Sequence, residues 1–153
     1  MVEFLRATVD QIAASASDMM LRDIAEMVPW DVELDPDIEF YKAIEKLGKF
    51  RGYLAFDGEK AIGYAWFFVN KHRHFKDHVW AIVDDYWLDP SYRRARIAKR
   101  FFEYIESDLF SIPEVTAVKL AYRDGHPAAQ RLFLSMGYLP LDTSCVKMRK
   151  KNA

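Results

Sequence analysis

The sequence predicts a mixed α/β fold, in which a mostly antiparallel sheet with a parallel central pair is flanked by helices. Three observations lead to this prediction. The first part of the chain carries apolar residues at helical spacing, the middle part changes to β-rich runs, and the last third alternates strand-like and helix-like segments. A strand, helix, strand, helix order after an antiparallel meander is typical of a sheet that includes a parallel pair.

Two helices are expected ahead of the sheet. From Val9 to Met27 apolar residues recur at roughly helical spacing, which predicts the first helix. A second helical stretch opens at Asp35 and Pro36 and ends at Gly48. The chain is therefore expected to begin with a helix followed by another helix.

Three consecutive antiparallel strands are expected between Arg51 and Pro90. The runs are RGYLAF, AIGYAWFFV and HVWAIVDDYWL, and the turn-like pair Asp57 and Gly58 separates the first two. Their aromatic side chains are best explained as sheet core, although they are also suited to lining an acceptor pocket. These residues are Trp66, Phe67, Phe68, Trp80 and Trp87.

The last third of the chain is expected to run from helix to strand to helix. Ile97, Phe101, Ile105 and Leu109 form the apolar stripe of the first helix, and VTAVKLAYR predicts a buried strand. The second helix extends from about Pro127 to Met136. The tail, YLPLDTSCVKMRK, predicts a last pair of extended segments, with Cys145 in the core.

Length and composition indicate one domain over residues 1–153 in a reducing compartment. The 22 basic and 23 acidic side chains nearly cancel, so overall charge does not favour a nucleic-acid or anionic-membrane binder. Cys145 is the only cysteine, which excludes an internal disulfide and a cysteine-based zinc cluster. Neither a signal peptide nor a membrane span is expected, which favours a cytoplasmic protein. Oligomeric state stays open, and a homodimer is compatible with the sequence.

The densest cationic cluster, RRARIAKR at residues 93–100, stands at the start of the best predicted helix. A helix N-terminus carries about half a positive charge, so cations there are unfavourable unless an anion compensates. A bound phosphate would compensate for Arg93, Arg94 and Arg96. Lys99 and Arg100 are equally well explained as a solvated basic face.

Two segments resemble motifs of the GNAT N-acetyltransferase superfamily. VDDYWLDPSYRRARIAKRFFEYIE resembles its central signature, and HPAAQRLFLSMGY resembles its Asn-x-x-Ala-x-x-Leu-Tyr-x-x-x-Gly-Phe motif. The positions that match are Leu88, Pro90, Tyr92, Arg93 and Ala98 in the first segment and Ala129, Leu132, Gly137 and Tyr138 in the second.

The resemblance implies a GNAT-like fold and acetyl-coenzyme A as cosubstrate, with no metal. It implies a loop whose backbone N–H groups wrap the coenzyme A pyrophosphate, and strand N–H groups that polarise the thioester carbonyl. The implied cofactor-binding residues are Trp87, Leu88, Arg93, Arg94, Ala95, Arg96, Ile97, Ala98, His126 and Phe133.

Three positions depart from the family pattern. Arg96 stands where a glycine is usual, so its side chain points outward, clamps the phosphate or blocks the loop. Phe133 stands where many members have a tyrosine that protonates the departing thiolate, and a phenylalanine cannot donate a proton. The replacement donors left open are Cys145, Tyr122 and Tyr138. His126 replaces an asparagine. It is expected to cap a helix or to face solvent, and a role as a catalytic base is the alternative.

Asp84 and Asp85 are the candidate catalytic residues. The acid pair resembles the Ile-Glu-Asp-aromatic pattern of small-molecule and polyamine acetyltransferases. One carboxylate would attract an ammonium group and take its proton before attack on the thioester. Strand alternation sends the two side chains to opposite faces, so only one is expected to meet the substrate cleft. A salt bridge near a sheet edge is the structural alternative.

The leading functional hypothesis is direct transfer of acetyl from acetyl-coenzyme A to a primary amine of a small molecule or protein. The alternative is a GNAT-like binding module with impaired catalysis, for which Arg96 and Phe133 are the evidence. A nucleic-acid-directed transferase is a minor option, since no recognisable reading motif is present. His72, His74 and His78 are expected in a solvated loop rather than a metal site.

Overall fold

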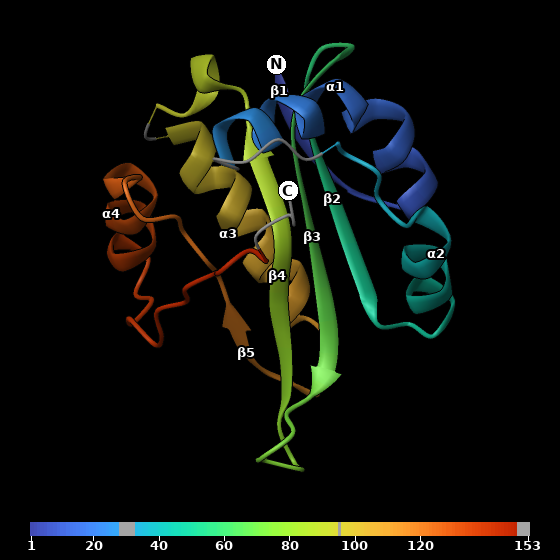
Figure 1. The fold of residues 1–153 in the computed structure, drawn as a ribbon, viewed down its shortest axis with the longest axis vertical. Helices are drawn as coiled ribbons and strands as arrows, with labels where there is room; N and C mark the ends of the chain where they lie inside the picture. Colours follow the sequence, from blue (N-terminus) through green and yellow to red (C-terminus); the bar gives the residue numbers. More distant parts are fainter. Residues whose placement is uncertain (28–32, 95, 150–153) are drawn as a thin grey trace. The chain divides into compact units, whose positions relative to one another are not determined.

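The computed structural model describes residues 1–27, 33–94 and 96–149 (Figure 1). The chain divides into two compact units, Met1–Ala121 and Tyr122–Ala153. In the second unit, the described helix is α4 (Pro127–Ser135). The elements of the first unit are β1 (Val2–Ala7), α1 (Val9–Met27), α2 (Ile38–Lys46), β2 (Phe50–Asp57), β3 (Lys60–Lys71), β4 (Val79–Leu88), the short 3-10 helix η1 (Pro90–Tyr92), α3 (Arg96–Phe110) and β5 (Val115–Lys119).

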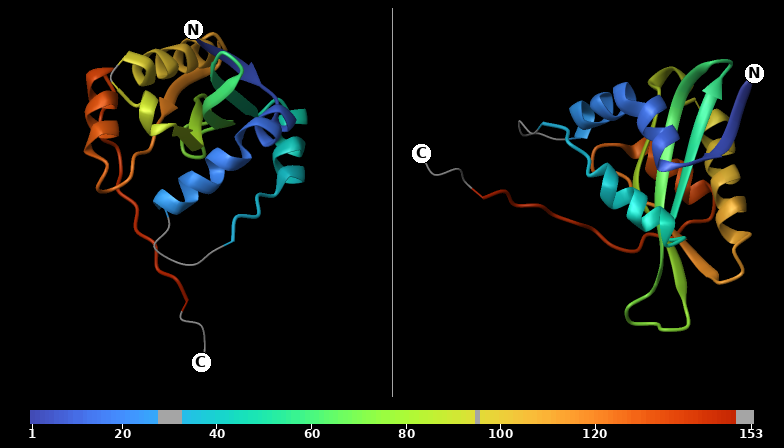
Figure 2. Two further views of the ribbon diagram at one scale, coloured as in Figure 1. Left: turned by 90° about the horizontal axis from the view of Figure 1, so that it is seen from above. Right: turned by 90° about the vertical axis from the view of Figure 1, so that its right-hand side faces the viewer.

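The five strands form one sheet in the order β1-β2-β3-β4-β5. The first four pair antiparallel, and β5 lies parallel to β4. Figure 2 shows α1 and α2 on one face of this sheet and α3 on the other. The predicted mixed α/β fold with a parallel pair is therefore confirmed.

Two segments differ from the sequence-based prediction. The chain begins with strand β1 rather than with a helix, and β1 pairs with β2 from Val2↔Asp57 to Ala7↔Gly52. β1 is an edge strand, and half of its residues are exposed. It becomes a strand through its pairing with β2, which lies far along the chain. Residues 138–149 belong to no strand, so the expected last strand pair is not found in this described part of the tail.

The core on the α1 face joins the sheet to the helices. Ile12, Ala16 and Met20 of α1 pack in one cluster with Tyr64, Trp66 and Trp87, and α2 adds partly buried side chains to it. Trp66, Phe67 and Trp87 are buried as expected, whereas Phe68 and Trp80 are only partly buried. The sheet therefore presents aromatic side chains toward α1 and α2.

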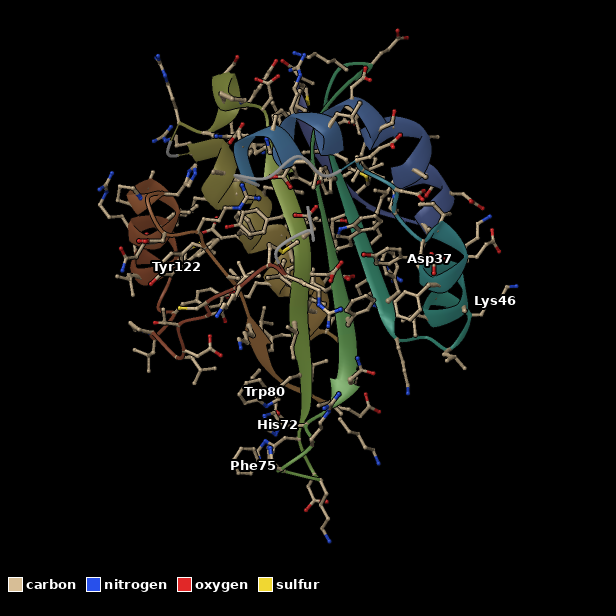
Figure 3. All side chains as sticks on the ribbon, viewed as in Figure 1. Asp37, Lys46, His72, Phe75, Trp80 and Tyr122 are labelled. Atoms are coloured by element: carbon tan, nitrogen blue, oxygen red, sulfur yellow. The ribbon has the colours of Figure 1, made fainter. Side chains whose placement is uncertain are left out.

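The hairpin between β3 and β4 extends beyond the other strands (Figure 1). His72 stacks near Trp80 and Phe75, with ring centroids 4.4 Å and 4.7 Å apart, and Figure 3 shows the three side chains gathered there. Among the described residues, no group of three or more His, Cys, Asp or Glu side chains could hold a metal ion. The hairpin is thus an aromatic and histidine cluster rather than a recognisable metal centre.

Candidate active site

A β-bulge in β4 sets the directions of Asp84 and Asp85. Trp66 pairs with Asp85 and Phe67 with Val83, so Asp84 is an extra residue in the ladder. A bulge bends its strand and re-aims the side chains beside it, which cancels the usual alternation. Both carboxylates line the same cavity. The expectation that only one of them meets a cleft is therefore wrong.

This cavity has a volume of about 300 Å³ and is built from α1, the segment before α2, α2, β3 and β4. We call it the acidic cavity, because the described residues that line it include four carboxyl groups and no basic side chain. Aliphatic and aromatic side chains form the rest of its wall. The lining residues are Met20, Ile24, Glu33, Leu34, Asp35, Pro36, Tyr41, Trp66, Asp84 and Asp85.

Asp85 belongs to a buried hydrogen-bond network with a second carboxyl group. The Tyr64 hydroxyl lies 2.6 Å from Asp85 Oδ2 and 3.1 Å from Asp23 Oδ2. Tyr64 is fully buried, and Asp23 is only 2% exposed. One hydroxyl has a single proton, so both contacts can be hydrogen bonds only if one carboxyl group is protonated. The Tyr64 hydroxyl therefore links the two carboxyl groups in one network.

Burial raises the pKa of Asp85 to about 7, and the charge of Asp23 adds to the effect. Hydrogen bonds from the Tyr64 hydroxyl and the Tyr86 backbone N–H act in the opposite direction. A carboxyl group that titrates near neutral pH can accept and release a proton under ordinary conditions. Its place in the lining of the cavity and this raised pKa make Asp85 the candidate for a proton acceptor.

Asp84 has a different environment, exposed at the mouth of the acidic cavity. Its Oδ2 accepts a hydrogen bond of 2.6 Å from the Tyr41 hydroxyl. Burial raises the pKa of Tyr41, and the hydrogen bond to Asp84 raises it further, so the phenol stays protonated as a donor. The Tyr41 ring stacks on Trp66 with centroids 4.4 Å apart and planes 5° apart. This stack holds the Tyr41 hydroxyl against Asp84.

Sequence reasoning missed Asp23, Tyr41 and Tyr64. One signal for Asp23 was present, because it follows Met19 and Met20 by four and three residues and so falls on the apolar stripe of α1. An acid on a buried stripe requires a partner. Tyr41 and Tyr64 carried no such signal, since aromatic residues are ordinary in core positions.

Arg93 is bound to protein groups after the end of β4. Its Nε donates to the Leu88 carbonyl oxygen at 2.7 Å, and its Nη2 pairs with Glu26 Oε1 at 2.8 Å. The same Glu26 oxygen accepts from Trp87 Nε1 at 3.2 Å, and the guanidinium lies 5.5 Å from the Trp87 ring centre. These contacts attach the segment after β4 to α1. They give Arg93 a structural role that its sequence position did not reveal.

The start of α3 provides exposed cations. Arg94 and Arg96 are exposed, Ile97 is partly buried and Ala98 is buried, while Ala95 lies outside the described residues. The first turn of α3 contains no acidic residue. Within the described part of the chain, neither Arg94 nor Arg96 forms an ion pair. A helix N-terminus with such side chains fits an anion.

The end of β4 has an edge that β5 does not cover. The described β4–β5 ladder runs from Val79↔Val115 to Ile82↔Lys119, whereas β4 continues to Leu88. Trp87 and Leu88, both buried, lie in the part of β4 that pairs with β3 but not with β5. The Tyr86 hydroxyl donates to the Ala121 carbonyl oxygen at 2.7 Å just beyond β5. Backbone groups of β4 beyond this ladder are candidates for hydrogen-bonding a ligand.

The remaining candidates lie in the second unit. His126 is the N-cap residue of α4, is exposed and makes no side-chain capping hydrogen bond. Phe133 is 2% exposed, and its ring centroid lies 5.9 Å from that of Tyr138. Tyr122, labelled in Figure 3, accepts a hydrogen bond from Gln130. Cys145 is exposed rather than in the core, because the tail that carries it joins no strand.

Comparison with known proteins was made by sequence and by structure. The family model of the acetyltransferase (GNAT) family matches residues 17–138. No curated protein matches the chain in sequence. A predicted acetyltransferase with acetyl-CoA from Clostridium acetobutylicum is similar in structure, with TM-score 0.73, 12% identity, and coverage of 97% of this chain and 96% of the other.

Two further solved structures are similar over nearly the full length of both chains. An aminoglycoside acetyltransferase from an uncultured soil metagenomic sample has TM-score 0.72 and 13% identity, with 99% of this chain and 97% of the other covered. A ribosomal-protein-alanine N-acetyltransferase from Brucella melitensis biovar Abortus 2308 has TM-score 0.69 and 12% identity, with 99% and 100% covered. At these identities, the similarity establishes the fold.

The mixed sheet with its parallel β4–β5 pair gives this chain the α/β fold of these solved structures. The chain belongs to the acetyltransferase (GNAT) family, since the family model matches well over half of its residues. Among the described residues, no helix is both long and apolar enough to cross a membrane.

Proposed function

We propose that this protein transfers an acetyl group from acetyl-coenzyme A directly to a primary amine, as a single cytoplasmic domain and without a covalent enzyme intermediate. One observation carries the proposal: Asp85, in its hydrogen-bond network with Tyr64 and Asp23, lines the acidic cavity. Family membership supports acetyl transfer. The aminoglycoside and ribosomal-protein-alanine acetyltransferases of similar fold make an amine acceptor plausible on chemical grounds.

In this proposal, Asp85 accepts the proton of the bound ammonium, which leaves a neutral amine with a free lone pair. Acetyl-coenzyme A supplies the activated acyl group, the C–N bond forms as the C–S bond breaks, and the acylated nitrogen releases its second proton to solvent water. A base that titrates at about pH 7 is matched to proton transfer at neutral pH. Substrate ordering within the cavity supplies much of the remaining acceleration.

The cosubstrate site is proposed at the end of β4 and the start of α3. Arg94, Arg96 and the backbone N–H groups of residues 95–98 would hold the pyrophosphate, as the exposed cations and the acid-free first turn indicate. The open edge at Trp87 and Leu88 would bind the thioester arm. His126 and Phe133, in the second unit, are proposed as cofactor-binding residues from the family resemblance alone. Because Phe133 has no proton to donate, the thiolate would leave as an anion and be protonated by water.

Thiol release from acetyl-coenzyme A, measured against a panel of amines, tests the proposal. We expect a wild-type rate that depends on the amine, and a loss of about 10²–10⁴-fold in Asp85→Asn. Asp77→Asn, in the β3–β4 hairpin, is the matched control for charge. If no amine stimulates thiol release but calorimetry detects coenzyme A binding, the chain is a binding module and the proposal is wrong.

A further inference from the structure

We propose that a second cavity, where β1 turns into α1, binds a small organic anion through the guanidinium groups of Arg6 and Arg51. The group that these arginines recognise is a carboxylate or a phosphate. The inference goes beyond the proposed function, because this cavity shares no described lining residue with the acidic cavity or with the proposed cosubstrate site.

This second cavity has a volume of about 400 Å³, which is enough for a metabolite-sized ligand. We call it the arginine cavity. Its described lining comes from the end of β1, the start of α1, the end of α2 and the start of β2. β1 pairs with β2 only as far as Ala7↔Gly52, so β1 does not cover the edge of β2 at Phe50 and Arg51. The cavity lies beside this uncovered part of β2.

Arg6 and Arg51 project from the same face of the sheet. Arg6 lies opposite Tyr53 in the β1–β2 ladder, and Arg51 precedes Tyr53 by two residues, so strand alternation sends all three side chains to one side. Burial and the hydrogen bond to Asp108 raise the pKa of Tyr53, whereas the charges of Arg51 and Arg6 lower it. Two positive charges therefore lie near one hydroxyl group, and both arginines line the same cavity.

Arg51 has a hydrogen-bond donor that the folded chain does not use. Its Nε atom is buried and has no hydrogen-bond partner among the described residues. A buried donor without an acceptor is unfavourable, so an acceptor on a bound molecule would stabilise it. The Nε–H and one Nη–H of a guanidinium form the fork that binds two oxygens of a carboxylate or a phosphate. The unused donor therefore points to an anionic ligand.

Arg6 adds a second cation that is only loosely held. Its Nε lies 3.8 Å from Asp108 Oδ2, which exceeds hydrogen-bond distance, and that oxygen already accepts from the Tyr53 hydroxyl at 2.8 Å. Glu45, the one acid in the described lining, accepts a hydrogen bond of 3.0 Å from the Val9 backbone N–H. The arginine cavity therefore presents two cations to a ligand, and its carboxylate already has a donor.

The N-terminus of α1 is not itself the binding group. The backbone N–H groups of Val9 and Gln11 already donate, to Glu45 Oε1 and to the Thr8 hydroxyl oxygen. The charged contacts with a ligand would come from the two arginine side chains instead. Phe50 gives the lining an apolar part, against which the carbon atoms of a ligand can pack. This combination favours an organic anion over a bare inorganic ion.

Calorimetric titration with sodium succinate and with sodium phosphate tests the inference, at an ionic strength held constant with sodium chloride. We expect saturable binding of at least one anion, and the tighter one identifies the recognised group. Arg51→Gln should raise its Kd about ten-fold or more, as the loss of one charge-assisted contact does. Arg51→Lys keeps the charge without the fork and should restore only part of the affinity. Arg73→Gln, exposed in the β3–β4 hairpin, is the matched control and should leave the Kd unchanged.

Arg94→Ala separates this cavity from the cosubstrate site, which is also proposed to bind phosphate groups. The Kd that depends on Arg51 should keep its wild-type value in Arg94→Ala. If Arg51→Gln does not fold, Arg6→Gln takes its place and should raise the Kd as well. The inference is overturned if neither anion binds saturably, if Arg51→Gln and Arg73→Gln raise the Kd equally, or if binding is lost in Arg94→Ala and kept in Arg51→Gln. Because the readout is binding, these outcomes do not depend on acetyl transfer.

Discussion

The Tyr64 hydroxyl lies between the carboxyl groups of Asp23 and Asp85, and this arrangement affects the pKa of Asp85. The charge of Asp23 raises the pKa of Asp85, while the hydrogen bond from Tyr64 lowers it. Burial adds the largest upward effect and brings the value to about 7. The two neighbours therefore act on the same carboxyl group in opposite directions.

The pH dependence of activity should report these opposite effects. A base is active when deprotonated, so kcat/KM should rise with pH through the pKa of Asp85, about 7. Asp23→Asn removes a raising influence and should move this acid limb to lower pH. Tyr64→Phe removes a lowering influence and should move it to higher pH. The measurement is kcat/KM of each variant across pH with a single acceptor.

Asp18→Asn, on the exposed side of α1, serves as the control for this pH profile. The acid limb of kcat/KM in this variant should coincide with that of wild type. Shifts of Asp23→Asn and Tyr64→Phe in the same direction would contradict the network. If either residue is only structural, its substitution should lower kcat/KM at every pH and leave the acid limb at its wild-type position.

Phe133 offers a second test at the level of one side chain. It is 2% exposed, so Phe133→Tyr places a hydroxyl in a buried position, which costs about 1–3 kcal/mol of stability without a partner. We expect no gain in acetyl transfer, because a thiol with a pKa near 8.5 can leave as an anion. Steady-state thiol release and urea unfolding measure both effects. A large gain in rate would instead identify an impaired enzyme.

The end of β4 and the start of α3 depend on arginines with separate tasks. Arg93 binds the Leu88 carbonyl and Glu26 of α1, whereas Arg94 and Arg96, at the start of α3, form no ion pair within the described residues. Of the arginines in this basic run, Arg93 contacts other parts of the protein, and Arg94 and Arg96 are the ones proposed to bind the cosubstrate. Gly63 lets β3 pack closely against the end of β4. A Cβ atom at position 63 would lie only 3.0 Å from the Trp87 carbonyl oxygen.

Single substitutions should separate these tasks. Arg93→Ala should lower the free energy of unfolding by about 1–3 kcal/mol, since it leaves Glu26 and the Leu88 carbonyl without this donor. Arg94→Ala should keep stability within about 0.5 kcal/mol. It should also weaken coenzyme A binding by roughly 1.5–3 kcal/mol. Urea unfolding and calorimetric titration of each variant give the two quantities. Equal losses of affinity at unchanged stability would show that both arginines bind the ligand.

Over the whole molecule, a net charge of −1 conceals two regions of opposite sign. Acidic side chains gather at the acidic cavity, and exposed cations gather at the start of α3. Local fields of this kind attract oppositely charged ligands to separate places. The distribution suits a cationic acceptor and an anionic cosubstrate, which composition alone did not indicate.

The stability of the folded chain should depend on pH through Asp85. Its pKa is raised to about 7 when folded, against an ordinary value of about 3.9 expected in the unfolded chain. The folded state binds the proton more tightly, so the free energy of unfolding falls as pH rises between these values. Asp85→Asn should remove this fall and gain most, relative to wild type, above about pH 7. Urea unfolding across pH measures it, with Asp77→Asn as control.

The sequence by itself determined the fold class, the order of helices and strands from residue 9 to residue 135, and the acid pair in β4. Helical periodicity, β-rich runs and turn residues are local signals, and each element from α1 to α4 carries them. The first strand lacked such a signal, because its partner β2 lies far along the chain. Cys145 was misplaced for a related reason, since its predicted strand needed a partner that residues 138–149 do not have.

Only the tertiary structure decided what the candidate side chains contact. Regular alternation separates Asp84 from Asp85, and the bulge opposite Trp66 and Phe67 brings both to one cavity. A bulge depends on the register between two strands, which neither strand specifies alone. The partners of Asp85 come from α1 and β3, and that of Arg93 from α1. Contacts between distant segments form only when the packed sheet and helices bring them together.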